Sequence, residues 1–480
     1  MTLPLVPVPT RLQWHQGAPV SLDQSVKVRA PHHLAPAVAG MLGIAEQHIM
    51  TTDGAWASGQ DQPSCAVVLS ETTGDGEGYV LRAGDGVVAL TGSRMGLLRG
   101  LTTVVQLRDL AAPGAPAGQV PAVHIEDEPR LAVRGLMIDV ARHFFGVASI
   151  KRVLDLMAGY KFNVLHLHLS DDQGWRIEVP SRPELTERSG GTEVGGGPGG
   201  FFTVADYQEI VEHAAVRGIE VVPEIDMPGH VNAAQHALGA LNDSGEPAEP
   251  YTGIEVGFSK LSLANPATAA FIDEVLAHLA AITPGEYLHV GGDEVHQMPR
   301  EEYRAFARHL ALAARRAGKK PQLWGEAAVA ELPAGTRVQL WDSNADHAPV
   351  VAAARAGAGV VLSPGDRVYL DMKYHQGYEL GLDWAGYVQV RDSYDWDPAQ
   401  YAEGLPPEAI EGVEAALWTE TLSREEHLFT MLLPRLVAVA EVGWSAQEQR
   451  EWEDFASRAR AHAPLWEDGG YAYHRSTQVF

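Results

Sequence analysis

The chain has 480 residues, of which 45% are hydrophobic and 20% are charged, an ordinary composition for a soluble globular protein. Its 36 Lys and Arg residues against 62 Asp and Glu residues give a formal net charge of −26, which disfavours binding to phosphate backbones and to anionic lipid surfaces. We therefore expect neither a nucleic-acid partner nor a membrane partner. The single cysteine, Cys65, excludes an intrachain disulfide framework and a cluster of thiolate metal ligands, and its apolar neighbours favour a buried structural thiol.

The N-terminal residues lack a basic start followed by an unbroken apolar stretch, and no run of about 18 apolar residues follows. These features favour a cytoplasmic protein, although a secreted enzyme trimmed to a new Met1 would look the same. Nothing in the sequence indicates an oligomeric state.

Residues 1–128 are predicted to form a small α+β domain. Ser93 is a suitable N-cap for a helix from Arg94 to about Leu110. No motif in this region points to chemistry. The strand-like runs, separated by turn residues, are Ser25–Arg29, Cys65–Ser70, Gly78–Arg82 and Gly86–Thr91.

Residues 129–480 alternate apolar runs with helical stretches, about eight times, which predicts a TIM (β/α)8 barrel. An open, doubly wound sheet is the alternative. The runs are Leu131–Val140, Phe162–Leu169, Ile219–Ile225, Tyr287–Val290, Gln322–Trp324, Val338–Trp341, Val360–Leu362 and Val413–Trp418. The predicted helices are Ser149–Tyr160, Ala205–Arg217, Pro266–Ala281, Arg300–Ala317, Pro349–Ala356 and a last one from Ser423 toward Val442, and the helix of the fifth unit is weak.

Three long loops follow strands of the predicted barrel: Arg182–Thr203, Gly239–Lys260 and Pro364–Gly412. In a barrel, all three would open onto the face at the carboxyl ends of the strands, where barrel enzymes carry out their chemistry. This excess of loop on one face favours an enzyme with a walled pocket.

The strongest chemical feature follows the fourth predicted strand, where two glycines precede the adjacent carboxylates Asp293 and Glu294. In a desolvated pocket two such groups cannot both ionise freely, so the pKa of one should rise while the other stays charged. That division suits general acid catalysis at a glycosidic oxygen. A solvated acidic turn is the alternative, but the position after a barrel strand favours the catalytic interpretation.

Histidines and acids also end two other strands. His166 and His168 share one face of a strand, a spacing that suits either a zinc site or two hydrogen-bonded core histidines. Asp171 and Asp172 follow this strand, and one of them could orient a histidine. His230 follows Pro-Gly after the next strand, on a stiff turn at the presumed active face, and an Asp–His pair near an acid can tune its proton transfers.

Three tryptophans, Trp324, Trp341 and Trp418, each close a separate strand-like run. At equivalent strand ends they predict aromatic walls around one cavity, and aromatic faces pack against the C–H faces of sugars. Glu420 and Arg142 are candidates to bind sugar hydroxyls at the rim, and a surface ion pair is the alternative for Arg142.

Several motifs together resemble the family 20 glycoside hydrolases, the β-N-acetylhexosaminidases. The resemblance covers about residues 134–445 and, more weakly, the N-terminal domain. The motifs are Arg134-Gly-Leu-Met-Ile-Asp139-Val-Ala-Arg142, His166-Leu-His168-Leu-Ser-Asp171-Asp172, Glu224-Ile-Asp-Met-Pro-Gly-His230, His289-Val-Gly-Gly-Asp293-Glu294, Trp324-Gly-Glu326, Tyr369-Leu-Asp371 and Leu417-Trp-Thr-Glu420.

The resemblance implies a retaining mechanism in which the 2-acetamido oxygen of the substrate attacks the anomeric carbon, an exception to the two-carboxylate scheme. By motif position, Glu294 would be the acid and base, and Asp293 would hold the acetamido N–H. Asp171 and His230 would form a relay that supports Glu294. Tyr369 would bind the acetamido oxygen.

The resemblance also implies the remaining substrate-binding residues of an exo-acting pocket and needs no metal or other cofactor. Around the acetamido methyl group and the sugar ring it places Trp324, Trp341 and Trp418; on the ring hydroxyls Arg142, Asp371 and Glu420; and on the leaving-group side Trp384. The implied partner is an oligosaccharide or glycoconjugate that carries a terminal β-linked N-acetylhexosamine.

Two other functions remain as alternatives at this point. One is a metal-dependent barrel hydrolase that uses His166, His168, His230 and Asp293. The other is a sugar-binding module that has kept the pocket without turnover, against which the intact acids and Tyr369 argue.

Overall fold

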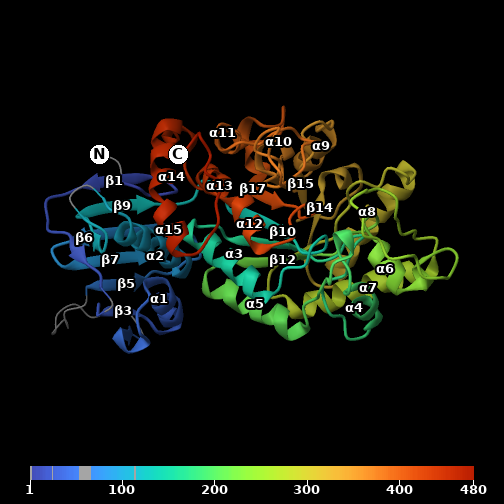
Figure 1. Cartoon of the computed structure of the whole chain (residues 1–480), viewed down its shortest axis with the longest axis horizontal. Coiled ribbons are helices and arrows are strands. Elements are labelled where there is room, and N and C mark those ends of the chain that lie inside the picture. The colour runs from blue at the N-terminus through green and yellow to red at the C-terminus, as the bar shows by residue number, and fades with distance from the viewer. Residues whose placement is uncertain (1–2, 24, 53–65, 113–114) are drawn as a thin grey trace.

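The computed structural model describes residues 3–23, 25–52, 66–112 and 115–480 and contains a seven-stranded sheet followed by a closed barrel of eight strands (Figure 1). The sheet belongs to the N-terminal α+β region, drawn in blue, and the barrel to the rest of the chain. The two units lie side by side, and the C-terminal helices α14 (Trp452–Ala461) and α15 (Ala463–Asp468), which the sequence did not predict, lie next to the N-terminal unit.

In the N-terminal unit, helix α2 (Arg94–Asp109) packs on the sheet through buried residues such as Leu97 and Leu101. The Ser93 side chain accepts a hydrogen bond from the Gly96 N–H, so the predicted cap is confirmed. Cys65 lies outside the described residues. In spatial order the strands are β1 (Arg11–Trp14), β9 (Val123–Asp127), β6 (Tyr79–Gly84), β7 (Val87–Gly92), β5 (Val67–Glu71), β3 (Val28–Pro31) and β4 (Ile49–Thr52); β2 (Val20–Ser21) pairs with β8 (Gln119–Val120), and α1 spans Ala35–Leu42.

The barrel closes because its last strand pairs in parallel with its first, which rules out the open doubly wound sheet. Its strands are buried almost throughout, the pattern expected where helices cover a parallel sheet. They are β10 (Val133–Asp139), β11 (Val164–His168), β12 (Glu220–Glu224), β13 (Tyr287–His289), β14 (Lys320–Trp324), β15 (Arg337–Leu340), β16 (Gly359–Leu362) and β17 (Ile410–Leu417).

The predicted barrel helices lie close to their predicted bounds, except the last. The barrel also contains four short helices between its strands that were not predicted, three of them within predicted long loops; the four are Glu184–Ser189, Asn232–Ala237, Gly365–Val368 and Val390–Tyr394. The fifth unit has only a short 3-10 turn, Gly325–Val329, as its weak pattern suggested. The last predicted helix is divided at Pro434, because proline lacks the N–H that an unbroken helix needs. The helices are α3 (Val147–Gly159), α4 (Glu184–Ser189), α5 (Val204–Val216), α6 (Asn232–Ala237), α7 (Pro266–Ile282), α8 (Arg300–Arg316), α9 (Ala348–Arg355), α10 (Gly365–Val368), α11 (Val390–Tyr394), α12 (Glu425–Leu432) and α13 (Arg435–Trp444).

Buried charges join the two units. Lys161 Nζ lies 2.9 Å from Asp127 Oδ2, and the Trp444 indole N–H donates to Asp127 Oδ1. Glu77, from the loop before β6, pairs with Arg99 of the same unit and Arg134 of the barrel, both at 2.5 Å. These contacts fix the N-terminal sheet against the amino-terminal end of the barrel, away from the carboxyl ends of its strands.

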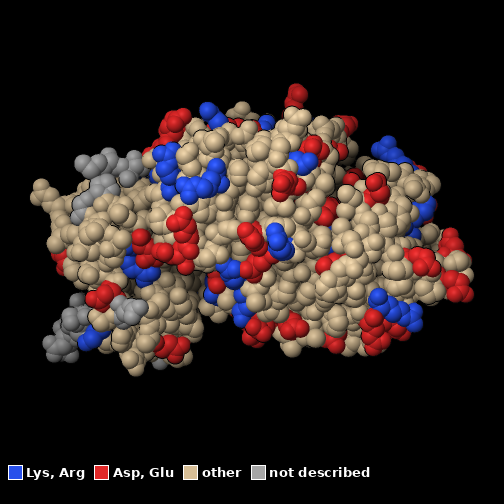
Figure 2. All heavy atoms as spheres, in the orientation of Figure 1, with Lys and Arg blue, Asp and Glu red and all other residues tan. Residues whose placement is uncertain are grey.

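The surface in Figure 2 carries acidic groups scattered among basic ones and uncharged residues, so the excess negative charge is spread over this face. Among the described helices, none is both long enough and apolar enough to cross a membrane.

Candidate active site

A cavity of about 530 Å³ opens at the carboxyl ends of the barrel strands. Its lining comes from seven of the loops that follow strands, two of which are the long loops Gly239–Lys260 and Pro364–Gly412. Nine of the twelve predicted site residues line it: Arg142, Asp293, Glu294, Trp341, Tyr369, Asp371, Trp384, Trp418 and Glu420. The other three, Asp171, His230 and Trp324, lie behind this lining, and each is at most 2% exposed.

A tight turn after β13 presents Asp293 and Glu294. Gly291 and Gly292 have φ values of 72° and 116°, which favour glycine. A Cβ atom on Gly291 would lie 1.7 Å from Asp226 Oδ1, so only glycine fits there. Glu294 itself is left-handed at φ 53°, a strained conformation for a residue with a side chain and one that is concentrated at functional sites.

His230 contacts both acids. Its Nε2 atom lies 3.3 Å from Glu294 Oε2 and 3.7 Å from Asp293 Oδ2, while its Nδ1 atom lies 3.2 Å from Asp171 Oδ1. His230 is also left-handed, at φ 56°. The structure therefore brings together the four residues predicted to be catalytic.

The two adjacent acids differ in pKa, in the opposite sense to the one that their roles suggest. Burial, the charge of Asp226 and a hydrogen bond with Asp226 raise the pKa of Asp293 well above its usual range. Burial also opposes ionisation of Glu294, but the hydrogen bond and charge of His230 outweigh it and leave the pKa of Glu294 below its ordinary value. The division between the acids is present, and Glu294 is the charged member.

Several buried polar atoms of residues that line the cavity lack hydrogen-bond partners within the described chain. Both carboxylate oxygens of Asp371 are buried without a hydrogen bond, as are Arg142 Nε and Asp293 Oδ1. Burial and the nearby charge of Glu420 raise the pKa of Asp371 well above its usual range. Because burying an unpaired polar group is costly, these atoms indicate a ligand with several hydroxyl or amide groups.

Aromatic rings form one wall, with Tyr369 among three tryptophans. The ring centroid of Tyr369 lies 6.1 Å from that of Trp341 in a stacked arrangement, 5.6 Å from that of Trp384 edge-on, and 6.3 Å from that of Trp418. Trp324 is fully buried and packs against Trp418 at 5.9 Å. It therefore supports the wall from behind.

The two strand histidines hydrogen bond to acids in the barrel core. His166 contacts Glu224 and Glu414, and His168 contacts Glu224 and Asp171. Asp171 therefore orients His168 as well as His230. Both ring nitrogens of each histidine contact carboxylate oxygens within 3.0 Å, the geometry of hydrogen-bonded core histidines.

Four acids within the family motifs lie at or behind the site but had no role predicted from the sequence. Asp139 accepts the N–H and hydroxyl bonds of Thr419 and lies 3.4 Å from Arg142, so it holds two substrate-side loops. Glu326 accepts the Trp341 indole N–H, and burial with the charge of Asp293 raises its pKa to about 8. The others are Glu224 and Asp226. The sequence signal that could have identified these residues is an acid within an otherwise apolar strand or just after its end.

Comparisons with known proteins agree with this geometry. The family model for the glycosyl hydrolase family 20 catalytic domain matches residues 132–447, and the model for domain 2 of that family matches residues 2–128. The chain belongs to glycosyl hydrolase family 20. A β-N-acetylhexosaminidase from Cellulomonas fimi is 56% identical over 387 residues, which cover 81% of this chain and 78% of the relative.

Solved structures of the family share the fold. A mutant Streptomyces plicatus β-hexosaminidase in complex with its product GlcNAc has a TM-score of 0.91 and 43% identity, covering 99% of this chain and 97% of that one. An exo-β-N-acetylglucosaminidase from Vibrio harveyi in complex with N-acetylglucosamine has a TM-score of 0.84 and 28% identity, covering 98% and 78%. The present chain is thus a glycoside hydrolase of the β-N-acetylhexosaminidase type.

Proposed function

We propose that this enzyme releases terminal, non-reducing β-linked N-acetylglucosamine and N-acetylgalactosamine with retention of configuration, using the acetamido group of the substrate as nucleophile. The observation that carries the proposal is the turn that presents Asp293 and Glu294 side by side, both in contact with His230, against a wall of aromatic rings. The substrate is an oligosaccharide or glycoconjugate with such a terminal residue.

In the first step the acetamido oxygen forms a bond to the anomeric carbon while the bond to the leaving oxygen breaks. Glu294 gives its proton to that leaving oxygen, and Asp293 accepts the acetamido N–H and stabilises the positive charge of the oxazolinium ion. In the second step Glu294 takes a proton from water, which attacks the anomeric carbon and reopens the ring. Two inversions at one carbon give overall retention.

Sugar binding would reverse the pKa shifts of these two acids. The Glu294 side chain is 26% exposed, so a sugar in the cavity would remove its remaining water and raise its pKa. An amide N–H donated to Asp293 would favour its charged form and lower its pKa. Substrate binding thereby favours the protonated form of Glu294 and the charged form of Asp293, which orients the acetamido group.

The pocket also explains why the enzyme acts on terminal residues. Arg142 and Asp371 are at most 3% exposed and the Glu420 side chain is 12% exposed, whereas Trp384 is 45% exposed. A sugar whose hydroxyls bind the three less exposed residues would point its leaving group toward Trp384 and the solvent.

The decisive experiment compares nitrophenyl β-glucoside with its 2-acetamido analogue. An enzyme that recruits the acetamido oxygen should hydrolyse the analogue and lose nearly all activity on the plain glucoside. Comparable kcat/KM values for the two compounds would refute the substrate-assisted mechanism, and failure to cleave either would refute the activity.

A further inference from the structure

Glu224, at the end of β12, is a densely hydrogen-bonded side chain beneath the pocket. It is fully buried, and four nitrogen atoms lie within 3.0 Å of its carboxylate. Oε2 accepts from His166 Nε2 at 3.0 Å and from His168 Nδ1 at 2.5 Å. Oε1 accepts from the Trp324 indole N–H at 2.8 Å and lies 2.7 Å from His289 Nδ1.

One of these bonds starts a chain of hydrogen bonds and close charge contacts that ends at the catalytic acid. His168 Nε2 contacts Asp171 Oδ2 at 2.9 Å, and Asp171 Oδ1 contacts His230 Nδ1. His230 Nε2 then reaches Glu294. Carboxylates and imidazoles alternate along this path, so each group fixes the orientation and charge of the next.

The bond to Trp324 starts a second path, to the aromatic wall. Trp324 packs against Trp418, and the Arg142 guanidinium lies 4.8 Å from the centroid of the Trp418 ring. The hydrogen bond from the indole N–H fixes the orientation of the Trp324 ring, so Glu224 holds in place the ring that supports the wall.

We propose that Glu224 is a positioning residue that couples the proton relay behind Glu294 to the tryptophan wall that holds the sugar. The carboxylate touches no substrate. It acts through His168 on one side and through Trp324 on the other, and it holds acid and wall at a fixed separation. This proposal rests on the proposed function, because it assigns Glu224 to the same reaction.

The test uses Glu224→Gln, which keeps the shape and removes the charge, beside Glu414→Gln as matched control. Glu414 is equally buried and accepts from His166 and Gln339, but it contacts neither the relay nor the wall. We expect Glu224→Gln to lower kcat/KM on the 2-acetamido substrate about 10²-fold, the cost of a small misplacement at the reacting centre, and Glu414→Gln to change it less than threefold at a similar Tm. Glu224→Asp, which keeps the charge, should have a kcat/KM between those of Glu224→Gln and the wild type.

The pH profile separates positioning from a general structural defect. Removing the Glu224 charge should lower the pKa of His168, so that Asp171 binds the His230 proton more tightly and His230 holds the pKa of Glu294 lower. The alkaline limb of kcat, which reports the pKa of Glu294 in the enzyme–substrate complex, should then move to lower pH in Glu224→Gln. Other charged and titratable groups face this relay in both enzymes, so their contributions cancel in the comparison; they are Arg142, Asp172, Asp226 and Asp293.

Two single-link variants keep the test decisive if Glu224→Gln does not fold. Trp324→Phe removes only the indole contact and should raise KM and the inhibition constant for N-acetylglucosamine, with a small change in kcat. His168→Gln cuts the relay and should lower kcat and shift the alkaline limb, with a small change in KM. Wild-type activity on the 2-acetamido substrate establishes the reaction independently; with it in hand, an unshifted profile, or equal losses in the Glu224 and Glu414 variants, would overturn the positioning role.

Discussion

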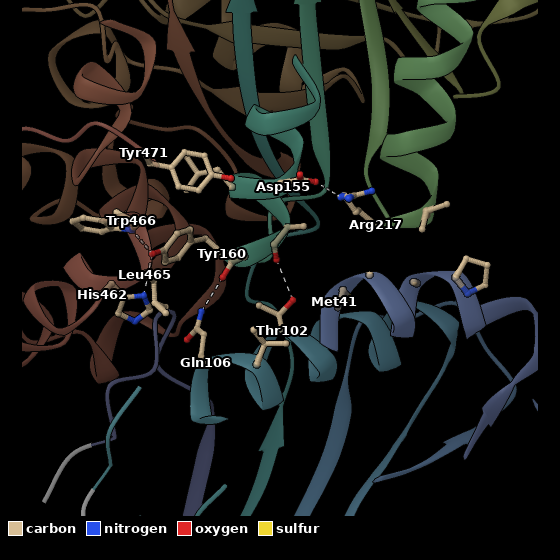
Figure 3. Close-up of a pocket in the computed structure, with 18 residues that line it drawn as sticks. Met41, Thr102, Gln106, Asp155, Tyr160, Arg217, His462, Leu465, Trp466 and Tyr471 are labelled. Carbon is tan, nitrogen blue, oxygen red and sulfur yellow. Dashed lines mark hydrogen bonds and ion pairs between the residues drawn. The ribbon is translucent and has the colours of Figure 1, made fainter. Parts of the chain in front are cut away.

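The cavity at the barrel mouth and a second cavity, of about 380 Å³, between the N-terminal unit and the barrel differ in how their polar groups are used. In the interdomain cavity the Tyr160 hydroxyl accepts from the Trp466 indole and contacts His462, Arg217 pairs with Asp155, and the Thr102 hydroxyl donates to a backbone carbonyl (Figure 3). At the barrel mouth, buried atoms of Asp371, Asp293 and Arg142 have no partner within the described chain.

This difference separates a binding site from a seam between domains. Tyr160 and His462 are both fully buried, and burial lowers the pKa of His462 to about 4, so the imidazole is neutral and its ring nitrogens are used in structural hydrogen bonds. Folding has paired the interdomain groups with one another. At the barrel mouth, both carboxylate oxygens of Asp371, one oxygen of Asp293 and the Nε atom of Arg142 have no partner among the described residues, at a cost in stability that a binding site accepts.

The largest expected effect is at the barrel mouth. Glu294→Gln should lower kcat on an unactivated disaccharide by about 10²–10⁴-fold, because it removes the proton donated to the leaving oxygen. Steady-state kinetics on purified enzyme measures this. Glu255→Gln, an exposed carboxylate between two cavity-lining residues, is the control and should stay within twofold of wild type; near-normal turnover by Glu294→Gln would mean that another group is the acid.

An intermediate effect is expected at the domain seam, on stability and not on catalysis. Glu77→Gln leaves the buried Arg99 and Arg134 unpaired and should lower the free energy of unfolding by about 3 kcal/mol, with kcat/KM of the folded enzyme unchanged. Denaturant unfolding measures the change. Glu126→Gln, in an exposed pair with Arg11, is the control and should cost less than about 1 kcal/mol.

The pH dependence of Glu77 sharpens the same prediction. Burial opposes its ionisation, but Arg99 and Arg134 lower its pKa to about 2, from an ordinary value of 4.5. Its contribution to stability is therefore complete above pH 4.5 and is lost as the pH falls toward 2. Unfolding curves in that range should be less steeply pH-dependent in Glu77→Gln; equal slopes would argue against this ion pair.

The smallest effect is expected at the interdomain cavity itself. Gly40 lies inside helix α1, and a Cβ atom there meets no other atom within 4 Å. Gly40→Ala should raise the free energy of unfolding by about 0.5–1 kcal/mol and leave kcat/KM unchanged. Gly43→Ala, at the left-handed cap of the same helix with φ 66°, should destabilise instead. A loss of activity in Gly40→Ala would mean that this cavity contributes to catalysis.

Much of the site followed from local sequence pattern. Parallel strands buried on both faces read as apolar runs, so the eight strands, their order and the acids at their ends were predicted within a few residues. The Gly-Gly-Asp-Glu turn was equally readable, because the glycines that allow its backbone and the acids that it presents are neighbours in the chain. The break at Pro434 was also visible in the sequence and was overlooked within a long helical pattern.

Other properties depended on contacts between distant segments. Closure of the barrel brought β17 against β10 and excluded the open sheet. The same closure placed Glu224 among histidines of two other strands and the Trp324 indole. It also placed Asp226 beside Asp293, and this contact helps to raise the pKa of Asp293 above that of Glu294, the reverse of the order that their roles suggest.

The sequence by itself determined where the eight strands lie along the chain, the acidic turn and the tryptophans at the strand ends, because each is a pattern within one short segment. Only the tertiary structure decided which acid is charged, which tryptophans line the cavity and which cavity is left with unpaired groups. A pKa, a burial and a hydrogen bond depend on what lies across the barrel, and residues far apart in the chain meet there only after folding.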